Sequence, residues 1–513
     1  MQKLLSFAIV AASALAFSNI ALAQSGAAEG CPENSASKSF TDRFSDTYGD
    51  YMKWNGDPAD AAPSWRKDVQ APPLSSPPYP FATWPIGGTE TIGYDNQYYG
   101  ALMDTIYCGP NGKAWKDSRV TVYGWINPSM NVSTSKSKFN FKTGTGGNYP
   151  AAYSYEPNTV QLNQAAIYFE RVPDVVQKDH NDWGFRVTGL FGTDYKYTFS
   201  KGLFSDQYTD KGKKYGFDPV MMYGEWYTPF VAEGMNVRFG RYISIPDIEA
   251  QLAPNNYTYT HSLLYTFDPY TQQGIVATIK LNKNWTIQGE VSAGNDVAIW
   301  NKSERQVTPA ACLGWTSDSA NDNVYACLNG AHPILGNNGK FGWNNVQHEV
   351  LTWYHKFDDK WHMSSEYWKM YQNNTPNVND VTGAGPALLA ARYGNLNYGA
   401  PSGAQCGPND GPTCKSHEWA FVNYIGYQAT PRDSITFRTD IFDDTTGQRT
   451  GFKTRYYELG LGWQHWLGKA ITIRPEIRYE RSTDIDAYDN PTATAGGGKF
   501  SQTMFAVDAV IHF

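Results

Sequence analysis

Polar and apolar side chains alternate along most of the chain from Arg119 to its end, as expected for β-strands whose two faces differ chemically. The alternation is clearest in residues 473–481, where Ile473, Ile477 and Tyr479 share one face. Strands of this kind are predicted at 119–134, 158–171, 182–199, 218–227, 235–243, 273–281, 285–294, 346–356, 361–371, 417–428, 434–442, 455–466, 470–481 and 502–513. The pattern therefore predicts an all-β fold of about 14 antiparallel strands, within a range of roughly 12 to 16.

Short and long connections alternate between these strands. Tight polar turns are predicted at 281–285, 357–361, 429–433 and 466–470. Long connections are predicted near 135–157, 196–217, 244–272, 295–345, 372–416 and 482–501, with a shorter one at 443–454. This alternation is typical of a single transmembrane β-barrel with short periplasmic turns and long outer loops. The pattern is weakest in 158–230, where Val160 and Leu162 are out of phase with Ile167 and Phe169.

The composition agrees with a barrel and excludes helical membrane spans. Beyond residue 23, no apolar stretch reaches the roughly 18 residues that a membrane-spanning helix needs. The chain is 15% aromatic with 35 tyrosines, and Tyr and Trp favour the headgroup level of a bilayer. A mean hydropathy of -0.51 fits a barrel because only alternate residues of each strand touch lipid. The net charge of -7 and the lack of a basic tail give no sign of a nucleic-acid partner.

The N-terminus indicates export. A positive start, an apolar stretch over 4–17 and the small residues Ala21 and Ala23 predict a cleaved signal peptide over 1–23. Residues 24–117 are predicted to form a Pro- and aromatic-rich extension, periplasmic or at the barrel mouth, and residues 118–513 the barrel. Within the extension, a Pro-rich stretch over 61–85 suits a periplasmic linker, which we favour, a wrap around the mouth, or a segment that enters the lumen.

The last strand places five residues on one face: Phe505, Val507, Ala509, Ile511 and Phe513. An amphipathic strand that ends in Phe resembles the C-terminal signal that the insertion machinery of bacterial outer-membrane barrels reads. The resemblance implies that the chain is located in the bacterial outer membrane. It also implies outer-membrane lipid and the barrel assembly machinery as partners.

Charged side chains occupy the face opposite the apolar one. An arginine facing lipid at the bilayer midplane would cost roughly 2–4 kcal/mol, whereas a water-filled lumen removes this cost. We therefore expect the charged face to line the lumen, although a soluble sheet with one wet face would show the same alternation. The predicted lumen-lining residues are Arg238, Glu290, Arg438, Asp440, Glu458, Arg474, Glu476, Arg478 and Glu480.

The third long connection, residues 244–272, is the candidate for a loop that folds inward and narrows the lumen. The charged residues that would form this constriction are Arg241, Asp247, Glu249 and Asp268, with Arg238 on the preceding strand. Carboxylates that face guanidiniums across a narrow opening would create a transverse field that screens ions. Tyrosines in the same loop suit either the stacking of sugars or plain packing. The alternative is an ordinary outer loop with a solvated acidic face.

Six cysteines fit an oxidising compartment. The favoured disulfides, each local to one segment, are Cys31–Cys108 before the barrel, Cys312–Cys327 in one predicted outer loop and Cys406–Cys414 in the next. Closing a loop of roughly 15 residues would contribute about 3 kcal/mol in the chain-entropy model. The sequence has no CxxC pair, and no His lies within a few residues of Cys312 or Cys327, so we predict no metal site and no cofactor.

Five segments together resemble a known family. They are 78–93 (PYPFATWPIGGTETIG), 119–135 (RVTVYGWINPSMNVSTS), 240–256 (GRYISIPDIEAQLAPNN), 438–452 (RTDIFDDTTGQRTGF) and 474–480 (RPEIRYE). They are similar to the OmpL-like β-barrel porin family, over nearly all of the chain after the signal peptide. The resemblance implies an outer-membrane barrel with a passive pore and no catalytic residues.

The favoured function is passive diffusion of small hydrophilic solutes or ions through a charged, water-filled lumen, and homo-oligomers would be compatible with it. A non-conducting structural or adhesive barrel is the main alternative and would have a plugged lumen. A barrel-embedded hydrolase is the least favoured. His261 and Ser262 are adjacent, but neighbours on a strand point to opposite faces and could not form a nucleophile–base pair there. We therefore expect no enzymatic activity.

Overall fold

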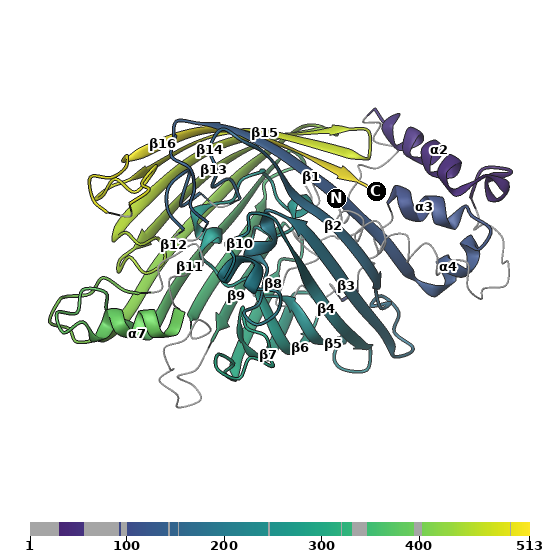
Figure 1. The fold of residues 1–513 in the computed structure, drawn as a ribbon. Helices are drawn as coiled ribbons and strands as arrows, with labels where there is room; N and C mark the ends of the chain where they lie inside the picture. The colour runs from purple at the N-terminus through teal and green to yellow at the C-terminus, as the bar shows by residue number, and fades with distance from the viewer. Residues whose placement is uncertain are drawn as a thin grey trace.

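The computed structural model describes residues 30–55, 92–93, 100–141, 144–151, 153–244, 247–319, 321–330, 346–393, 403–492 and 494–513. The predicted signal peptide over 1–23 lies outside them. Sixteen antiparallel strands follow one another in chain order around a closed barrel, and the last strand pairs with the first. Figure 1 shows long loops at one end of the barrel and the C-terminus at the other. We call these the long-loop end and the short-turn end.

The strands are β1 (Val120–Ser133), β2 (Val160–Arg171), β3 (Asp182–Gly192), β4 (Gly216–Thr228), β5 (Met235–Ile243), β6 (Thr271–Lys280), β7 (Trp285–Asn295), β8 (Thr308–Thr316), β9 (Asp322–Asn329), β10 (Gln347–Lys356), β11 (Trp361–Pro376), β12 (Thr413–Thr430), β13 (Asp433–Asp444), β14 (Thr454–Leu467), β15 (Ile471–Ser482) and β16 (Ser501–His512). The α-helices are α2 (Phe40–Met52), α3 (Ala101–Tyr107), α4 (Gly112–Ser118), α5 (Asp206–Thr209), α6 (Leu263–Thr266) and α7 (Ala384–Tyr393). The 3-10 helices are η1 (Ser35–Ser37), η5 (Asp194–Tyr197) and η6 (Ala253–Asn255).

Each predicted strand has a counterpart in the structure, which also contains a hairpin that the sequence pattern missed. Strands β8 and β9 lie within residues 295–345, which were predicted to be one outer loop. The inward positions of β8 include the small residues Ala310, Cys312 and Gly314, so the contrast between its two faces is weak. The barrel therefore has 16 strands, the upper limit of the predicted range.

A bulge explains the loss of phase in the second strand. The pairing of β1 with β2 shifts between Asn127 and Pro128. On β2, the consecutive residues Asn163 and Gln164 are both buried, whereas Val160 before them is 73% exposed. Because a bulge inserts one extra residue into one strand, the alternation resumes beyond it with the opposite parity.

Two of the predicted tight turns share one construction. In the turn before Trp285, the side chain of Asn282 accepts a hydrogen bond from the Trp285 N–H at 3.0 Å. In the turn before Trp361, Asp358 accepts one from the Trp361 N–H at 2.8 Å. Asn and Asp favour turns because their side chains satisfy nearby backbone donors in this way. The strands can therefore reverse within a few polar residues, as predicted.

Tryptophans surround the short-turn end of the barrel. The outward-pointing ones close to the turns include Trp183, Trp226, Trp285, Trp353, Trp361 and Trp463. The indole N–H of Trp353 donates to Asp322 at 3.2 Å, and that of Trp463 donates to Asp433 at 3.1 Å. A large apolar ring with one polar N–H suits the level of lipid headgroups, so these residues have the position of an aromatic girdle.

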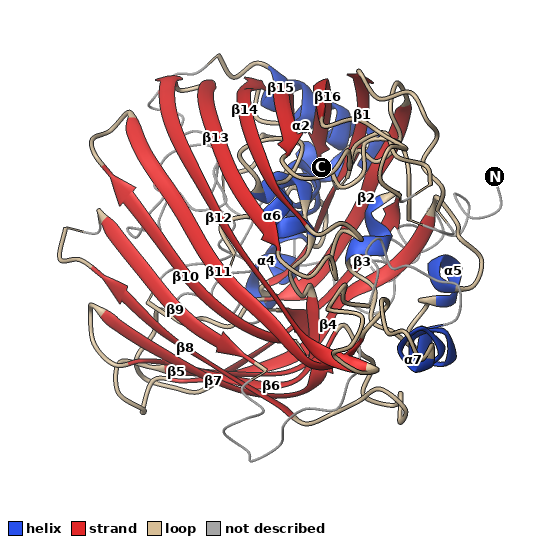
Figure 2. Ribbon diagram, turned by 90° about the vertical axis from the view of Figure 1, so that its left-hand side faces the viewer, coloured by secondary structure: helices blue, strands red, loops and turns tan. Residues whose placement is uncertain are grey.

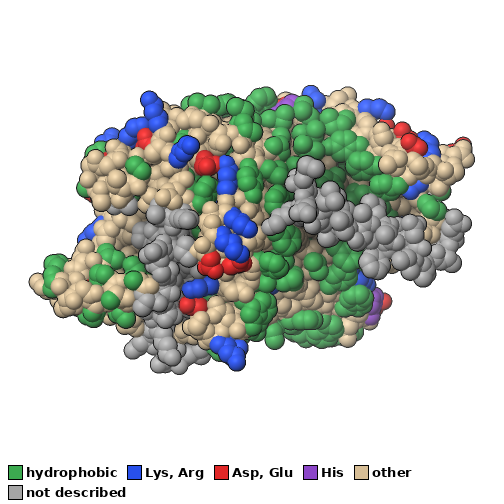
Figure 3. All heavy atoms as spheres, in the orientation of Figure 1, with side chains coloured by type: hydrophobic (Ala, Val, Ile, Leu, Met, Phe, Trp, Pro, Cys, Tyr) green, Lys and Arg blue, Asp and Glu red, His purple; other side chains and the backbone are tan. Residues whose placement is uncertain are grey.

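The two faces of the wall differ as predicted. Leu459, Leu461 and Ile477 are about half exposed on the outer face, whereas Glu458 and Arg478 at alternate positions are buried inside. Figure 3 shows hydrophobic side chains gathered over the strands, with Lys and Arg mainly toward the two ends. This division places apolar groups against lipid and charged groups within the barrel. Of the helices in the described residues, none has the length and apolar character needed to cross a membrane.

The described part of the N-terminal extension forms a small helical unit outside the barrel, at the short-turn end (Figure 1). Helix α3 covers part of the outer face of β1, where Met103 packs on Val122 and leaves it only 5% exposed. Helix α2 reaches the turn between β14 and β15, where the Lys469 N–H donates to the Tyr51 carbonyl at 2.8 Å. The stretch 61–85 lies outside the described residues.

The disulfides pair as predicted: Cys31–Cys108, Cys312–Cys327 and Cys406–Cys414. Cys414, predicted to be in a loop, is the second residue of β12, and one disulfide lies entirely in strands. Cys312 and Cys327 are not in a loop, because they face each other across β8 and β9. The Cys31–Cys108 bond joins the segment before α2 to the end of α3 and so holds the helical unit together.

The barrel closes where β16 meets β1. At the short-turn end of this seam, the Gly124 N–H donates to the Phe513 carbonyl at 3.2 Å, and the Phe513 N–H donates to the Gly124 carbonyl at 3.0 Å. A Cβ on residue 124 would lie 2.7 Å from Cζ of the Phe513 ring, so glycine leaves room for the ring. The other residues of the predicted insertion signal lie on the outward face of β16, between its buried inward positions. They are Phe505, Val507, Ala509 and Ile511.

Replacing Phe513 with Asp should impair assembly, because it puts a charge at the seam and weakens two backbone hydrogen bonds worth about 1 kcal/mol each. The wild-type protein should fractionate with outer membranes and migrate differently on SDS gels before and after boiling. The F513D variant should lack the heat-modifiable form, whereas F513Y, which keeps the ring, should resemble the wild type. Normal assembly of F513D would show that the terminal aromatic is only a packing residue.

Candidate functional site

The connection between β5 and β6 folds into the barrel, and we call its described residues, 244 and 247–270, the inner loop. Figure 2 shows its helix α6 within the ring of strands, where it packs against β12 and β13. In the circular strand order, β13 lies on the far side of the barrel from β5 and β6. The inner loop therefore crosses the lumen and reaches the opposite wall.

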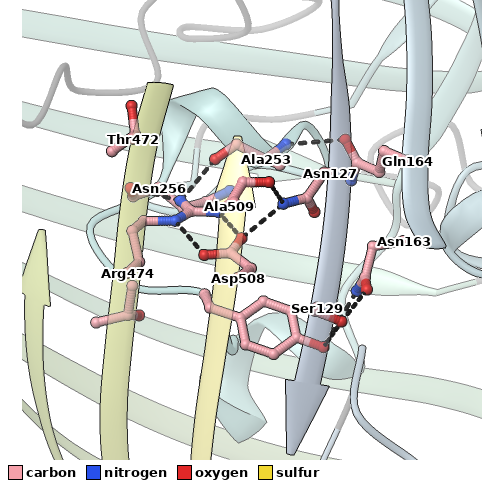
Figure 4. A network of polar contacts seen from close by, with 12 residues as sticks. Asn127, Ser129, Asn163, Gln164, Ala253, Asn256, Thr472, Arg474, Asp508 and Ala509 are labelled. Carbon is pink, nitrogen blue, oxygen red and sulfur yellow. Dashed lines mark hydrogen bonds and ion pairs between the residues drawn. The ribbon is translucent and has the colours of Figure 1, made fainter. Parts of the chain in front are cut away.

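Arg474 of β15 holds one part of the inner loop. Its guanidinium donates to the carbonyls of Ala253 at 2.7 Å and Asn256 at 3.1 Å. It also binds both carboxylate oxygens of Asp508 on β16, at 3.0 and 2.5 Å, and Asp508 in turn accepts from Asn127 on β1 at 2.8 Å. Figure 4 shows this network. Because a guanidinium has five donors in a fixed geometry, one arginine can join the loop to the barrel seam.

Two further arginines meet at Thr260. Arg438 of β13 donates to the Thr260 carbonyl at 2.5 Å and to its hydroxyl at 3.0 Å. Arg478 of β15 donates to the same hydroxyl at 2.8 Å. Glu476 accepts from the Thr260 N–H at 3.0 Å. Both arginines also pair with Glu458, at 2.6 and 3.0 Å, so the wall neutralises much of its own charge.

Hydrogen bonds attach the inner loop to other parts of the wall as well. On β12, the Tyr424 hydroxyl donates to Glu249 at 2.5 Å. On β2, the Gln164 amide donates to the Gln251 carbonyl at 2.7 Å and accepts from the Ala253 N–H at 3.0 Å. The bond to Ala253 is drawn in Figure 4. The strands that hold the inner loop through these bonds therefore lie along the part of the wall that runs from β12 through β16 and β1 to β2.

The predicted lumen-lining residues all point inward and are buried: Arg238, Glu290, Arg438, Asp440, Glu458, Arg474, Glu476, Arg478 and Glu480. The structure brings those of β13, β14 and β15 together in one network beneath the inner loop. Arg474 is 2% exposed and Arg478 is 0% exposed. These arginines therefore bind the loop and neighbouring carboxylates, whereas the alternating charges alone suggested side chains in open water.

The arginines expected to face the loop carboxylates have partners on β4 instead. Arg238 lies 3.3 Å from Glu225. Arg241 pairs with Asp218 at 2.9 Å and donates to the Thr198 carbonyl at 2.5 Å. The guanidiniums that approach the inner loop come from β13 and β15, whose positions around the lumen depend on strand order and not on closeness in sequence.

Asp247 and Asp268 of the inner loop meet Glu366 of β11. Burial, with repulsion from Asp268, raises the pKa of Asp247 well above its ordinary range. Burial also raises the pKa of Asp268 well above that range, with further repulsion from Glu366 and Glu249. Carboxyl groups so placed hold a proton more firmly than exposed ones do, and a protonated carboxyl can donate to its neighbour.

His261 and Ser262 have structural partners. The Nε2 atom of His261 lies 2.8 Å from the Ala250 carbonyl, and its ring stacks on Tyr153 with 3.8 Å between centroids. The Ser262 hydroxyl accepts from the Tyr265 N–H at 3.1 Å and caps α6. This arrangement is not a nucleophile–base pair. Over the part of the chain that the structure describes, no group of three or more His, Cys, Asp or Glu side chains could hold a metal ion.

A pocket lies beside the inner loop toward the long-loop end, and we call it the mouth pocket. Its volume is about 680 Å³, including space open to solvent. Its wall includes the aromatic residues Tyr155, Tyr197, Phe199, Phe267 and Tyr270 and the charged residues Lys196, Asp268, Asp296 and Arg449. Of these, sequence reasoning singled out only Asp268. The others come from several separate connections, and the one local signal is the Tyr-Lys-Tyr triplet at 195–197.

Comparison with solved structures finds porins at low sequence identity. The anion-selective porin from Comamonas acidovorans is 9% identical with a TM-score of 0.45, covering 77% of this chain and 99% of that chain. The outer membrane channel DcaP of Acinetobacter baumannii is 10% identical with a TM-score of 0.44, covering 77% and 97%. OmpT of Vibrio cholerae is 10% identical with a TM-score of 0.43, covering the same shares. No curated protein matches the chain.

A family model covers the whole barrel. The model described as "Putative beta-barrel porin-2, OmpL-like" matches residues 119–513, from the residue before β1 to the end of the chain. This agrees with the resemblance found in the sequence, and outer-membrane location and transport follow from it at the level of the family. The chain therefore belongs to this family of OmpL-like β-barrel porins.

Proposed function

We propose that the protein is an outer-membrane porin through which small hydrophilic solutes or ions diffuse passively, with the inner loop setting the width of the path. The observation that carries this proposal is that the loop crosses the lumen and binds the opposite wall through Arg438, Arg474 and Arg478. In this proposal, the inner loop narrows the lumen and leaves a path beside it. We propose no catalytic activity.

The arrangement of charge suggests where selectivity arises. The arginines of β13 and β15 are paired with carboxylates and bonded to the inner loop, so a passing ion would meet little of their charge. Charged groups at the mouth pocket are closer to the long-loop entrance. We propose that Arg438, Arg474 and Arg478 mainly position the inner loop and that solute preference depends more on the mouth pocket.

The family, the predicted signal peptide and the terminal strand support the following proposed setting. The short-turn end faces the periplasm, and the signal peptide over 1–23 is removed during export. Insertion depends on the barrel assembly machinery, which reads the terminal strand, and homo-oligomers could form within outer-membrane lipid.

A non-conducting structural barrel is the second candidate, and the aromatic packing around the inner loop favours it. Tyr197, Tyr153, His261 and Tyr265 stack in this order, with 4.2, 3.8 and 4.7 Å between successive centroids. A stack of this kind could plug the lumen and not merely narrow it. The two candidates differ in whether the barrel conducts.

The purified protein should conduct ions when it is reconstituted in a planar bilayer. We expect discrete, passive conductance steps that scale with salt concentration, because a water-filled path carries current in proportion to its ions. The reversal potential in a salt gradient would give the ion preference. Inserted, heat-modifiable protein that carries no current would favour the structural barrel.

Weakening the clamp on the inner loop should enlarge the path. In the double variant R438Q/R474Q, the loop loses bonds at Ala253, Asn256 and Thr260, and each broken buried ion pair costs roughly 3–5 kcal/mol. We expect a larger and noisier single-channel conductance than in the wild type. The matched control is R241Q, because the guanidinium of Arg241 bonds to residues of β4 and to the Thr198 carbonyl. Equal conductance in all three proteins would show that the loop does not limit flow.

The carboxyl groups of Asp247 and Asp268 should make the inner loop sensitive to pH. Because burial raises their pKa in the folded protein, their contribution to loop stability is present at low pH and is lost as pH rises above the ordinary carboxyl range near 4. Current noise from loop motion should therefore increase as pH rises above the ordinary carboxyl range. The D268N variant should show a flatter profile, whereas D206N, at an exposed site, should not differ from wild type. An identical profile for D268N would contradict this assignment.

A further inference from the structure

Most cations inside the barrel have a carboxylate partner. Over the described residues, the buried arginines of the barrel form the ion pairs Arg186–Glu170, Arg238–Glu225, Arg241–Asp218, Arg438–Glu458, Arg474–Asp508 and Arg478–Glu480. Lys196 and Arg449, which line the mouth pocket, differ from them. Among the described residues, no carboxylate lies within ion-pair distance of either side chain. Two cations without a paired acid therefore share one pocket.

Lys196 is held by aromatic rings and one carbonyl. Its Nζ donates to the Thr193 carbonyl at 3.0 Å and lies 5.0 Å from the ring centroid of Tyr197 and 5.5 Å from that of Tyr155. Asp194 attracts it at longer range, but that carboxylate already accepts from amide and hydroxyl donors. Burial lowers the pKa of Lys196 to about 8, so its ammonium is still charged at pH 7. It therefore has donors to offer a ligand.

Arg449 is also incompletely satisfied. Its Nη2 donates to the Met370 sulfur at 2.8 Å, and its Nε is buried without a partner. Asp444 and Glu418 act on it at longer range. One Asp444 oxygen accepts from the backbone N–H of Arg449 itself, at 3.0 Å. Arg449 also lines the pocket, and a guanidinium suits a planar, two-oxygen acceptor such as a carboxylate.

The two acids of the pocket do not cancel these charges. Asp296 accepts from the Thr271 N–H at 2.8 Å and from the Tyr270 N–H at 3.2 Å, and so fixes the end of the inner loop. Asp268 belongs to the buried carboxyl cluster with Asp247 and Glu366, where burial raises its pKa. The pocket therefore places Lys196 and Arg449 beside aromatic walls on which a flat ring could stack.

We propose that the mouth pocket is a binding site for small organic anions that carry a flat ring, with the carboxylate held by Lys196 and Arg449 and the ring against Tyr155, Tyr197 and Tyr270. Both cations offer charge-assisted hydrogen bonds, which are stronger than neutral ones. The aromatic side chains add contact area that a small inorganic anion cannot use. The inference rests on the proposed function, because it places a solute site at the entrance of the proposed path.

Equilibrium binding to the full-length protein in detergent micelles tests the site without requiring conduction. Isothermal titration with benzoate should show saturable binding. Acetate, which lacks the ring, and benzamide, which lacks the charge, should bind more weakly in the same experiment. The K196M and R449M variants should each bind benzoate about tenfold more weakly or worse, because each removes one charge-assisted contact. K211M is the matched control, since Lys211 is exposed and pairs with Asp206 outside the pocket.

Conductance in the same preparations separates this inference from the proposed function. If benzoate binds and both pocket variants lose affinity, the site is supported even if the barrel proves not to conduct. If the barrel conducts but benzoate binds no better than acetate and benzamide, or K196M and R449M bind it as well as K211M does, the site is overturned and the pore remains. Tighter binding of benzylammonium than of benzoate would likewise overturn it, because the acids would then dominate the pocket.

Discussion

Closure of the sheet on itself is the constraint on which the rest of the molecule depends. In hydrocarbon there is no water to satisfy a free strand edge, so each backbone N–H and C=O of the wall must find a partner in a neighbouring strand. The pairing of β1 with β16 removes the last edge, and the bonds between Gly124 and Phe513 continue it to the end of the chain. Closure then leaves only two environments for side chains, lipid outside and the lumen inside.

The lumen in turn makes the wall and the inner loop dependent on each other. A buried guanidinium is costly unless its charge and donors have partners, and the backbone carbonyls of a buried loop also need donors. Arg438, Arg474 and Arg478 satisfy both needs, because each binds a carboxylate of the wall and an oxygen of the loop. The need to pair both the guanidiniums and the loop carbonyls therefore explains the alternating charges on β13 and β15.

Strand positions were predictable because alternation is a local property. The prediction of strands failed where the inward and outward residues of a strand differed little in polarity or where a bulge changed the phase. Small inward residues such as Cys312 and Gly314 concealed the β8–β9 hairpin, and the bulge at Asn163 and Gln164 reversed the phase of β2. The inward direction of Arg474 and Arg478 was also predictable. They lie on the same face of β15, and arginine on a lipid-facing surface is costly.

The sequence by itself determined that the chain forms an antiparallel barrel, which residues face inward, that connection 244–272 was the candidate for an inward fold, and which cysteines pair locally. These features follow from spacing along the chain and from the cost of charge in lipid. Only the tertiary structure decided that the arginines of β13 and β15 bind the inner loop, that Arg241 pairs with Asp218, and that Lys196 and Arg449 share a pocket. The reason is that these contacts join residues far apart in sequence, and their distances depend on strand order and loop path around a closed barrel.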